Sequence, residues 1–289
     1  MNYKQLIKNC KSVRDYKETP IDEGYLDEII TYSKTCNRLV NNVDIECLLF
    51  NDSKDMLSKK LQGLAGYNGY MLKAPNYVLV LSDDIAHSIK NAGYIGESIV
   101  LKAEDLGISS CWITFEDGDK ILDALEIKTD KKIHAIISLG YESSASKKKV
   151  VNQMKTGENY SLCELGIADN DTASRLDVDE IVYIDEWGKK AETAILKSRG
   201  LLDVFNHTRM APSTLNRQPW RFLVDGCRVV LAIKDEPEAS HYDDQIDAGI
   251  VMFSFEMLVR STLCDTRWAF DDIDYNIPAG YKYIGYCEL

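Results

Sequence analysis

Apolar residues along the chain follow two patterns, a recurrence every three or four positions and short continuous runs. Residues 21–35 have the first pattern and come directly after Pro20, which predicts a helix that begins there. The runs at 77–82 and 132–139 are short and continuous, which predicts buried strands. The same patterns predict further helices at 53–64, 86–106, 191–205 and 247–263, and further strands at 43–50, 220–224, 228–233 and 281–287.

The stretch from 142 to 179 interrupts this pattern because it has few long apolar runs. We expect a connection that crosses the surface and includes a short helix. On either side of it the predicted elements have the same order: helix, strand, strand, long helix, strand. The sequence therefore divides into a first half at 1–150, a connector at 151–179 and a second half at 180–289. We expect the two halves to interlock as one globule.

Short signals also recur in the two halves. Leu-Gly-Tyr at 139–141 ends a strand of the first half, and Ile-Gly-Tyr at 284–286 ends a strand of the second. The long helices carry early glycines, Gly96 and Gly249, and Trp112 and Trp268 lie beyond those helices. An internal duplication of one α+β unit explains the recurrence. A chance likeness between two αβ halves is the alternative, and the pattern by itself leaves both open.

The composition narrows the class of protein. The 289 residues include 34 Lys and Arg against 46 Asp and Glu, a net charge of −12. This acidity argues against a general nucleic-acid binder, which needs a basic face. The longest nearly unbroken apolar stretch, 248–259, falls well short of the roughly 20 residues of a bilayer span, and the start of the chain lacks the apolar core of a signal peptide. We therefore expect a cytoplasmic protein that binds neither nucleic acid nor membrane.

The residue types that usually mark metal or nucleotide sites are not arranged as such sites require. The eight cysteines are widely and irregularly spaced, which predicts free thiols in a reducing compartment. The four histidines have no partner at metal-ligand spacing, so we predict no metal site. Without a strand followed by GxGxxG, a P-loop or a GxSxG motif, Rossmann, kinase-type and α/β-hydrolase sites are poorly supported.

Two short segments combine cations with serines. Lys11, Ser12 and Arg14 lie within four residues and suit an anionic phosphate, because Arg presents a fixed fork of donors and Ser adds a hydroxyl. A second run of cations follows serines and could also neutralise phosphate; it consists of Lys147, Lys148 and Lys149. A solvated surface segment is the alternative for both runs.

The loop at 210–222 is stiffened by two prolines and carries neutral polar side chains. These residues are Pro212, Ser213, Asn216, Gln218 and Pro219. Asn and Gln each offer a donor and an acceptor, so they can read the edge of a heterocycle. The proline that follows Gln218 predicts an extended conformation for that residue. An ordinary turn is the alternative.

The segment at 106–113 comes directly after the long helix of the first half. Gly107 allows a tight exit from the helix, and the small Ser109 and Ser110 let the backbone approach a flat ligand. Cys111 has no histidine near it in sequence and stands beside Trp112. We therefore predict a buried structural thiol rather than a nucleophile.

Together these segments resemble the nitroreductase family of FMN-dependent oxidoreductases. Segments similar to the family pattern are Lys-Ser-Val-Arg-Asp-Tyr at 11–16, Ala-Pro at 74–75, Gly-Ile-Ser-Ser-Cys-Trp-Ile at 107–113, Leu-Gly-Tyr at 139–141 and the lysines at 147–149. The family loop Ala-Pro-Ser-x-x-Asn-x-Gln-Pro-Trp should follow the first helix, where this chain reads Cys36-Asn37-Arg38-Leu39. It stands instead in the second half, at 211–220, and is the most specific match in the chain.

Enzymes of this family are usually intertwined homodimers with FMN at the subunit interface, so the displaced loop implies such a dimer fused into one chain. The resemblance implies an α+β, nitroreductase-like fold in two degenerate copies and a monomer that acts as a pseudo-dimer. The second half has Cys-Asp-Thr-Arg-Trp at 264–268 where the family has its Gly-Ser-Cys-Trp segment, and it has no basic tail. One working FMN site and one vestigial site are therefore implied.

The resemblance also implies roles for single residues. Lys11, Ser12 and Arg14 would bind the phosphate, the ribityl chain or the pyrimidine edge of FMN, and one or more of Lys147, Lys148 and Lys149 would add charge. The isoalloxazine would be lined by Pro212, Ser213, Asn216 and Gln218, and approached by the backbone of Ser109 and Ser110. The chain departs from the family pattern at Lys11, Ile108 and Ser109, where the family has Arg, Leu and Gly.

The implied activity is an FMN-dependent NAD(P)H oxidoreductase. NAD(P)H would reduce the flavin and be replaced by a small electron acceptor such as a nitroaromatic or a quinone, with no catalytic acid or base from the protein. Two alternatives stay open at this point: a flavin-binding redox protein or sensor without NAD(P)H turnover, and an interaction module that has lost FMN. The survival of complementary motifs in the two halves argues against the second alternative.

Overall fold

A computed structural model describes residues 1–52, 54–143, 148–152, 163–167, 174–236, 239–271 and 274–289. Its Cα positions group into two compact units. Unit 1 consists of Met1, residues 9–88 and residues 98–172. Unit 2 consists of residues 2–8, 89–97 and 173–289, so it takes in two segments from the N-terminal part of the chain. The predicted boundaries at 150 and 180 stay a prediction.

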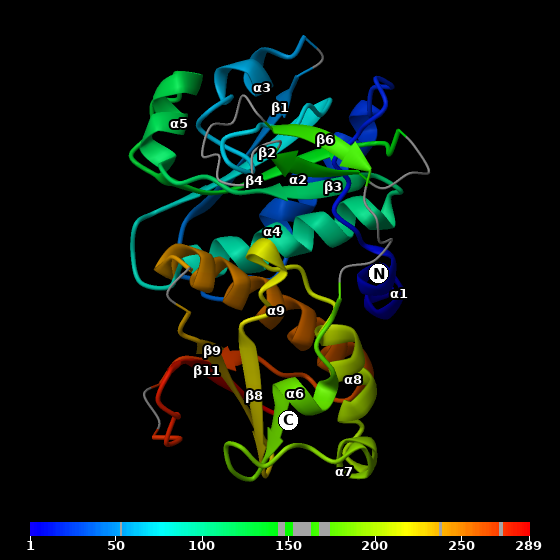
Figure 1. The fold of residues 1–289 in the computed structure, drawn as a ribbon, viewed down its shortest axis with the longest axis vertical. Helices are drawn as coiled ribbons and strands as arrows, with labels where there is room; N and C mark the ends of the chain where they lie inside the picture. The colour runs from blue at the N-terminus through cyan, green and yellow to red at the C-terminus, as the bar shows by residue number, and fades with distance from the viewer. Residues whose placement is uncertain (53, 144–147, 153–162, 168–173, 237–238, 272–273) are drawn as a thin grey trace. The chain divides into compact units, whose positions relative to one another are not determined.

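Unit 1 is built on a four-stranded antiparallel sheet with the order β1-β2-β4-β3 (Figure 1). The central strand β2 is buried along its whole length, as its continuous apolar run predicts. The strands are β1 (Ile45–Asn51), β2 (Asn76–Ser82), β3 (Ser109–Ile113) and β4 (Lys132–Gly140). Separate from this sheet, β5 (Lys148–Asn152) pairs with β6 (Cys163–Ile167).

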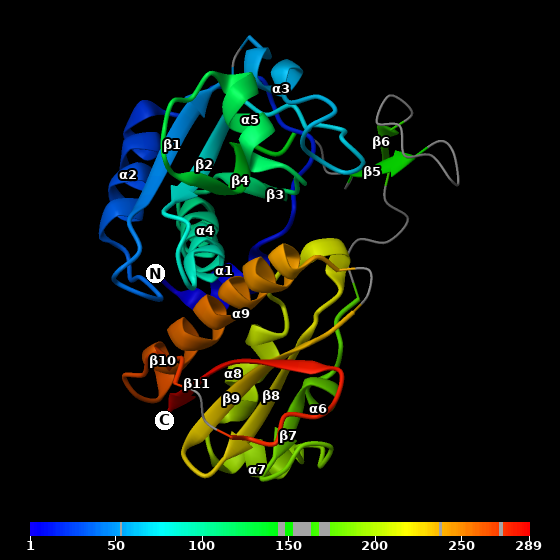
Figure 2. The same cartoon turned by 90° about the vertical axis from the view of Figure 1, so that its left-hand side faces the viewer.

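Helices cover both faces of this sheet. The predicted helices are confirmed as α2 (Glu23–Thr35), α3 (Met56–Lys60) and α4 (Ser88–Asp105), and α5 (Gly118–Leu125) was not predicted. In Figure 2, α3 and α5 lie over one face, and the end of α4 that belongs to unit 1 lies under the other. α5 begins at an Asp117 N-cap, whose side chain accepts from the backbone N–H of Lys120.

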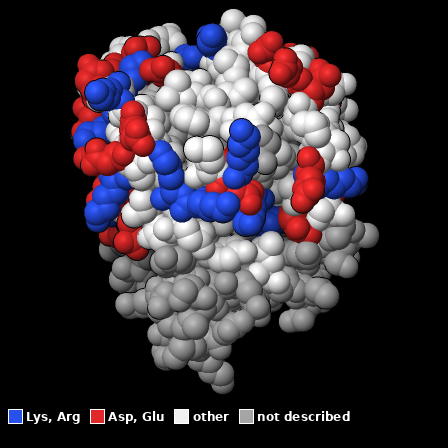
Figure 3. Space-filling model, turned by 90° about the horizontal axis from the view of Figure 1, so that it is seen from above, with Lys and Arg blue, Asp and Glu red and all other residues white. Residues whose placement is uncertain are grey.

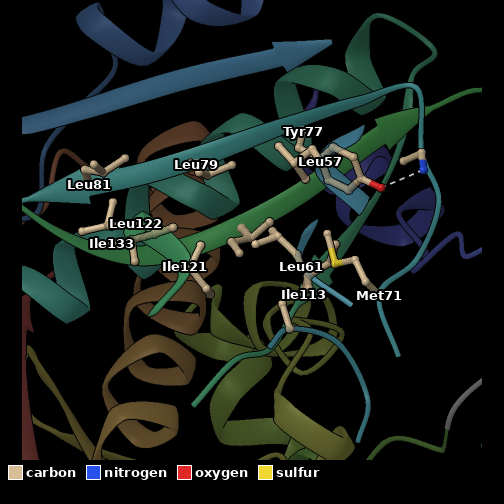
Figure 4. Packing of buried hydrophobic residues seen from close by; sticks show 13 residues of the cluster. Leu57, Leu61, Met71, Tyr77, Leu79, Leu81, Ile113, Ile121, Leu122 and Ile133 are labelled. Atoms are coloured by element: carbon tan, nitrogen blue, oxygen red, sulfur yellow. Dashed lines mark hydrogen bonds between the residues drawn. The ribbon is translucent and has the colours of Figure 1, made fainter. Parts of the chain in front are cut away.

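The core of unit 1 fills the space between the sheet and α3 and α5 (Figure 4). Leu79 and Leu81 of β2 pack there with Leu61 and Ile121 from the helical layer, all nearly without exposed surface. The hydroxyl of Tyr77 stays satisfied in this apolar setting because it accepts from the backbone N–H of Ala74 at 2.9 Å. This packing fixes the sheet that carries the N-terminal candidate residues.

Unit 2 has a five-stranded sheet with the order β10-β11-β9-β8-β7. Its strands are β7 (Val182–Ile184), β8 (Trp220–Asp225), β9 (Arg228–Lys234), β10 (Trp268–Ala269) and β11 (Tyr281–Glu288). Its helices are α1 (Tyr3–Asn9), α6 (Val178–Ile181), α7 (Thr193–Ser198), α8 (Leu201–Thr208) and α9 (His241–Thr262), with a 3-10 turn at Thr214–Asn216. Phe205 of α8, Phe222 of β8 and Phe255 of α9 form its aromatic core, with ring centroids 5.2–5.6 Å apart.

One sequence prediction for unit 2 is wrong in detail. The helix predicted at 191–205 is two helices, α7 and α8, because Gly200 adopts a left-handed φ of 73° between them. The apolar periodicity continues across that break, which explains the single prediction.

The two sheets repeat one topology. In chain order β1, β2, β3 and β4 correspond to β8, β9, β10 and β11, and the sheet orders β1-β2-β4-β3 and β8-β9-β11-β10 then coincide. The long helix follows the second strand in both, as α4 and α9. A register shift interrupts the pairing of β2 with β4, and another interrupts the corresponding pairing of β9 with β11. This repetition confirms the two-copy α+β fold, to which unit 2 adds the parallel strand β7.

Charged side chains on the surface of unit 1 are largely paired. Figure 3 shows Lys and Arg side chains lying among Asp and Glu side chains on the face seen from above. Examples are Lys60 with Glu126 at 2.9 Å and Lys132 with Asp119 at 2.8 Å. Exposed pairs of this kind add little stability, but they neutralise much of the basic charge of this face.

Candidate functional site

The segment at 11–16 is held against the sheet of unit 1. The backbone N–H of Val13 donates to the carbonyl of Ser110 at 2.9 Å, and Ser12 forms a parallel bridge with Ser110. Nearly a hundred residues separate these two positions in sequence. The structure thus brings the N-terminal cation segment and the serine segment after α4 to one place, as the resemblance implies for a phosphate and ribityl site.

A third motif meets them at Gly140. A Cβ atom at Gly140 would lie 2.6 Å from the ring of Tyr16 and 2.8 Å from Pro75, so a larger residue does not fit there. The Tyr16 hydroxyl is 2.9 Å from the Ser138 hydroxyl, and burial raises its pKa well above the usual range. The Leu-Gly-Tyr and Ala-Pro motifs therefore support the N-terminal segment through packing.

The two N-terminal cations have different partners. The Lys11 ammonium pairs with the Glu142 carboxylate at 2.6 Å, whereas the Arg14 guanidinium donates to the backbone carbonyl of Ser12 at 3.1 Å. Within the described ranges, Arg14 makes no ion pair with a carboxylate. Burial raises the pKa of the neighbouring Glu104 carboxyl, and the Lys11 charge opposes that rise. Arg14 is therefore the better candidate to meet an added anion.

The serine segment is a strand rather than an open loop. Ser109 and Ser110 begin β3 and pair with Gly140 and Leu139 of β4. Cys111 is buried, and burial raises the pKa of its thiol. Its burial is as predicted, and a thiol that resists ionisation is a poor nucleophile; its structural role stays a prediction.

The lysine run is only partly described. Lys147 lies outside the described residues. Lys148 and Lys149 belong to β5, where their backbones pair with Ile167 and Gly166. Their role at a phosphate stays a prediction.

The loop that carries the most specific sequence match has an unusual backbone. Leu215, Asn216 and Gln218 all have left-handed φ angles, of 52°, 58° and 51°. Such angles are costly for residues other than glycine and cluster where structure serves function. The extended conformation predicted for Gln218 is therefore wrong: its backbone N–H donates to the Ser213 hydroxyl at 2.9 Å, and its side chain is held as described below.

Buried carboxylates of α9 anchor this loop. Arg217 donates to Asp247 at 2.9 Å and to Asp244 at 3.2 Å, and the Thr214 backbone N–H donates to Asp247 at 2.9 Å. Burial raises the pKa of Asp247 to about 7, although Thr214 and Arg217 favour its ionised form. The loop is thus fixed from its inner side before any ligand binds, which is the preorganisation that a ligand site needs.

The amides of the loop bind a neighbouring backbone segment. Gln218 accepts from the Leu176 N–H at 2.8 Å and donates to the carbonyls of Ser174 and Asn216 at 3.3 and 3.1 Å. Asn216 donates to the Ser174 carbonyl at 3.0 Å and accepts from the Arg175 guanidinium. In this structure these amides hold residues 174–176, rather than presenting free donors and acceptors.

The sequence did not predict several residues that hold the candidate site segments in place. Glu142, Arg175 and Asp247 act through contacts 30 to 131 residues away in sequence, which no local pattern encodes. One signal was present: Asp244 and Asp247 are charged residues, three apart, directly before the long apolar run of the same helix. Charged residues on a buried face require partners, so that spacing indicates an anchored cation.

The described residues contain no group of His, Cys, Asp and Glu arranged to hold a metal ion. None of their helices is both long and apolar enough to cross a bilayer.

Comparison with known proteins identifies the class. A protein family described as "Putative TM nitroreductase" matches residues 2–259. The chain therefore belongs to this nitroreductase family, which makes it an oxidoreductase by family. Membership also supports the FMN cofactor that the sequence predicts. No curated protein matches the chain.

One solved structure shares the fold over the whole chain, and others are similar to part of it. A structure described as a putative nitroreductase from Thermotoga maritima is 18% identical, covers 100% of this chain and 93% of its own, and superposes with a TM-score of 0.61. An FMN-dependent nitroreductase from Clostridium difficile is 24% identical over 49% of this chain and 88% of its own, with a TM-score of 0.42. A nitroreductase family protein from Clostridium novyi is 21% identical over 66% of this chain and 97% of its own, with a TM-score of 0.44.

Proposed function

We propose that the protein is an FMN-dependent oxidoreductase that passes electrons from NAD(P)H to a small organic acceptor such as a nitroaromatic or a quinone. Family membership supports the reaction class. The observation that carries the proposal is the hydrogen bond from the Val13 N–H to the Ser110 carbonyl. It joins two segments that the family pattern assigns to the same cofactor and that the sequence keeps far apart.

The residues present fit FMN by their chemistry. In unit 1, Arg14 offers a guanidinium without a carboxylate partner among the described residues, which donates to the Ser12 backbone carbonyl and suits a phosphate group. In unit 2, the loop at 211–220 offers a rigid, neutral surface whose φ angles are already fixed. We assign phosphate and ribityl binding to Lys11, Ser12, Arg14, Lys147, Lys148 and Lys149, and close backbone approach to the flavin to Ser109 and Ser110. The loop that lines the isoalloxazine contains Pro212, Ser213, Asn216 and Gln218.

Bound FMN supplies the redox chemistry itself. The residues of the chain bind and orient: Arg14 and Lys11 neutralise phosphate charge, Ser12 donates its hydroxyl, and the anchored loop excludes water from the ring. Because Gln218 and Asn216 already bind residues 174–176, we propose that they position the loop and that its backbone and Ser213 meet the ring. No side chain is assigned as a catalytic acid or base.

The fused arrangement belongs to the same proposal. Residues 1–150 and 180–289 are the two copies, and residues 151–179 connect them. The Pro-Ser-Asn loop exists in the second copy, and Cys36-Asn37-Arg38-Leu39 replaces it in the first. We therefore propose one FMN per chain and a monomer that acts as a pseudo-dimer.

Anaerobic stopped-flow absorbance tests the activity. The protein loaded with FMN is mixed with NADH or with NADPH, and we expect the flavin absorbance to bleach with at least one of them and to recover when a quinone is added. Bleaching by dithionite but by neither nicotinamide would overturn the NAD(P)H step and favour a flavin-binding sensor. A protein that stays colourless after incubation with FMN would overturn the cofactor assignment as well.

A further inference from the structure

One carboxylate of α9 spans the turn at the centre of the Pro-Ser-Asn loop. Oδ1 of Asp247 accepts from the Thr214 backbone N–H at 2.9 Å, and Oδ2 accepts from Nη2 of Arg217 at 2.9 Å. Leu215 and Asn216 lie between these two contacts and have left-handed φ angles of 52° and 58°. The two oxygens of a single carboxylate therefore hold the residues on both sides of the left-handed turn.

The turn needs this support because its backbone conformation is costly. Residues other than glycine keep left-handed φ angles only where the surrounding contacts impose them. The Thr214 hydroxyl adds contacts of 3.4 Å to Asp247 and 3.3 Å to Asp243. Asp247 is 1% exposed, so water does not compete for its oxygens. Solvent therefore cannot replace the carboxylate that holds the turn.

Other carboxylates share the arginine of this contact. Nη1 of Arg217 lies 3.2 Å from Asp244 and 3.6 Å from Glu236, which follows β9. Asp243, four residues before Asp247 on α9, adds a further negative charge near it. Of these four carboxylates, Asp247 is the one that joins both sides of the turn.

The charge on Asp247 changes near neutral pH. Burial raises the pKa of its carboxyl to about 7, and the Thr214 N–H and the Arg217 charge oppose that rise. Lys90 lies on α4, which packs against α9, but its ammonium is directed to the Ile284 carbonyl. Protonation of Asp247 removes the charge that holds Arg217, so the support of the turn weakens as pH falls.

The first copy lacks this carboxylate as well as the loop. Asn-Ala-Gly at 91–93 of α4 matches Asp-Ala-Gly at 247–249 of α9, and each glycine lies against the backbone of the other helix. Asn91 is buried, as Asp247 is, but it carries no charge. The acid is present in the copy that keeps the loop, and an amide takes its place in the copy that has lost it.

The arginine follows the same rule. Arg217 stands three residues before β8, and Asn42 stands three residues before β1, the corresponding strand. Both charges of the pair are thus present in one copy and replaced by amides in the other. Because the two copies share their topology, the fold does not require the pair. Its presence follows the loop that we assign to the flavin.

We propose that the ionised carboxylate of Asp247 positions the Pro-Ser-Asn loop for the flavin, so that the loop binds FMN tightly only while Asp247 is charged. Because FMN must meet that loop, this role rests on the proposed function. Asp247 acts through Thr214 and Arg217 on the loop backbone and on Ser213. It is a positioning residue and not a catalytic one.

Fluorescence titration of the apoprotein with FMN between pH 6 and pH 8 tests the role. From pH 8 to pH 6 the Kd of the wild type should rise about five- to tenfold, because a group with a pKa of about 7 becomes mostly protonated. Asp247→Asn should raise the Kd at pH 8 about 10- to 30-fold, since its amide cannot pair with the guanidinium. Its Kd should lack this part of the pH dependence, and the difference between the two profiles cancels the titration of FMN itself.

Glu256→Gln is the matched control. Glu256 is also a buried carboxylate of α9, but its arginine partners are Arg260 at 3.4 Å and Arg267 at 3.7 Å, outside the loop. This variant should keep the Kd and the pH profile of the wild type. The double variant Asp247→Asn/Arg217→Asn copies the amide pair of the first copy, and it should lose FMN affinity as Asp247→Asn does. It serves as the test if circular dichroism shows the single variant to be unfolded.

The outcomes separate this role from the proposed function. A wild type that does not bind FMN overturns the proposed function itself. If the wild type binds FMN, the role of Asp247 is overturned when Asp247→Asn, or the double variant in its place, binds FMN as tightly at pH 8. A wild-type pH profile retained in that variant, or an equal rise in Kd in Glu256→Gln, also overturns it and leaves the proposed function standing.

Discussion

Gly93 of α4 and Gly249 of α9 stand in reciprocal positions. A Cβ atom at Gly93 would lie 2.4 Å from the carbonyl oxygen of Ile246, which is three residues before Gly249. A Cβ atom at Gly249 would lie 2.0 Å from the carbonyl oxygen of Lys90, which is three residues before Gly93. Each glycine thus admits the backbone of the other helix at the matching place.

Reciprocal contacts of this kind are the mark of a two-fold interface, in which residue i meets j and the copy of j meets the copy of i. The sequence supports the same pairing, since Trp112 is 19 positions after Gly93 and Trp268 is 19 positions after Gly249. The two long helices that correspond in the repeated topology, α4 and α9, therefore meet at matching positions within one chain.

Substituting either glycine by alanine should destabilise the protein. Gly93→Ala and Gly249→Ala each place a methyl group against backbone, which cannot move aside as a side chain can. We expect each to lower the free energy of unfolding by about 3 kcal/mol, measured by urea titration.

Gly24→Ala is the matched control. This glycine also lies in a helix, but its Cβ would meet a side chain, Asp22, at 2.9 Å. Alanine generally favours helix over glycine by about 1 kcal/mol. Displacing Asp22, the N-cap whose carboxylate accepts from the Gly24 N–H at 2.8 Å, costs about as much, so this variant should change stability by less than about 1 kcal/mol. Unchanged stability of Gly93→Ala or Gly249→Ala would refute the close helix contact.

The free energy of unfolding should change with pH in the alkaline range because of Lys90. It is buried, its ammonium lies 3.4 Å from the Ile284 carbonyl and 4.6 Å from the ring centre of Phe270, and burial lowers its pKa from 10.5 to about 8. Between these values the unfolded chain holds a proton that the folded chain does not. Stability therefore rises with pH through this window and is lost as pH falls.

Lys90→Met removes the cost in folding free energy of holding a charged ammonium at this buried position. At pH 7 the penalty is about 3 kcal/mol, and the lost cation–π contact offsets about 1 kcal/mol of it, so the variant should be about 2 kcal/mol more stable. The difference in free energy of unfolding between Lys90→Met and the wild type should narrow by about 2 kcal/mol between about pH 7 and pH 9.5. Lys59→Met, at an exposed position of α3, should show no such change. A gap that is independent of pH would count against a buried, weakly basic Lys90.

Arg14 should matter more for FMN binding than Lys11. Arg14 has no carboxylate partner among the described residues, whereas Lys11 is already paired with Glu142. Loss of one charge-assisted contact weakens binding by about 2–3 kcal/mol. Arg14→Met should therefore raise the Kd for FMN about 30- to 100-fold, and Lys11→Met only a few-fold, in fluorescence titrations of the apoprotein. Equal effects, or a larger effect of Lys11→Met, would contradict this assignment of charge.

Gln218 should act as a clamp on residues 174–176. The Leu176 N–H donates to its side-chain oxygen at 2.8 Å. In Gln218→Ala this donor is released, and hydrogen exchange at Leu176 should become about tenfold faster, which corresponds to about 1.4 kcal/mol of lost protection. The amide of Val224, in β8, serves as control and should not change. Unchanged exchange at Leu176 would show that the segment is held by other contacts.

Much of the fold follows from local sequence patterns. The buried runs of β2 and β4 and the periodicity of α2 and α4 predicted those elements to within a few residues. β3 was missed as a strand because Ser109, Ser110 and Cys111 have no strong strand preference, and its pairing with β4 decides its conformation.

The candidate site, too, could be predicted only in part from the sequence. The motifs named the residues of the cation segment and the loop, but their partners Glu142, Asp247 and Leu176 come from distant parts of the chain. The left-handed φ of Gln218 is the clearest case, because the local effect of Pro219 favours an extended residue and the distant hydrogen bonds prevail.

The number of FMN molecules per chain tests the account most directly. The chain is saturated with FMN, freed of excess cofactor and denatured, and the released flavin is quantified by absorbance against protein determined by amino-acid analysis. One working site and one vestigial site in a fused pair of copies predict one FMN per chain. Two FMN per chain would contradict the loss of the second site.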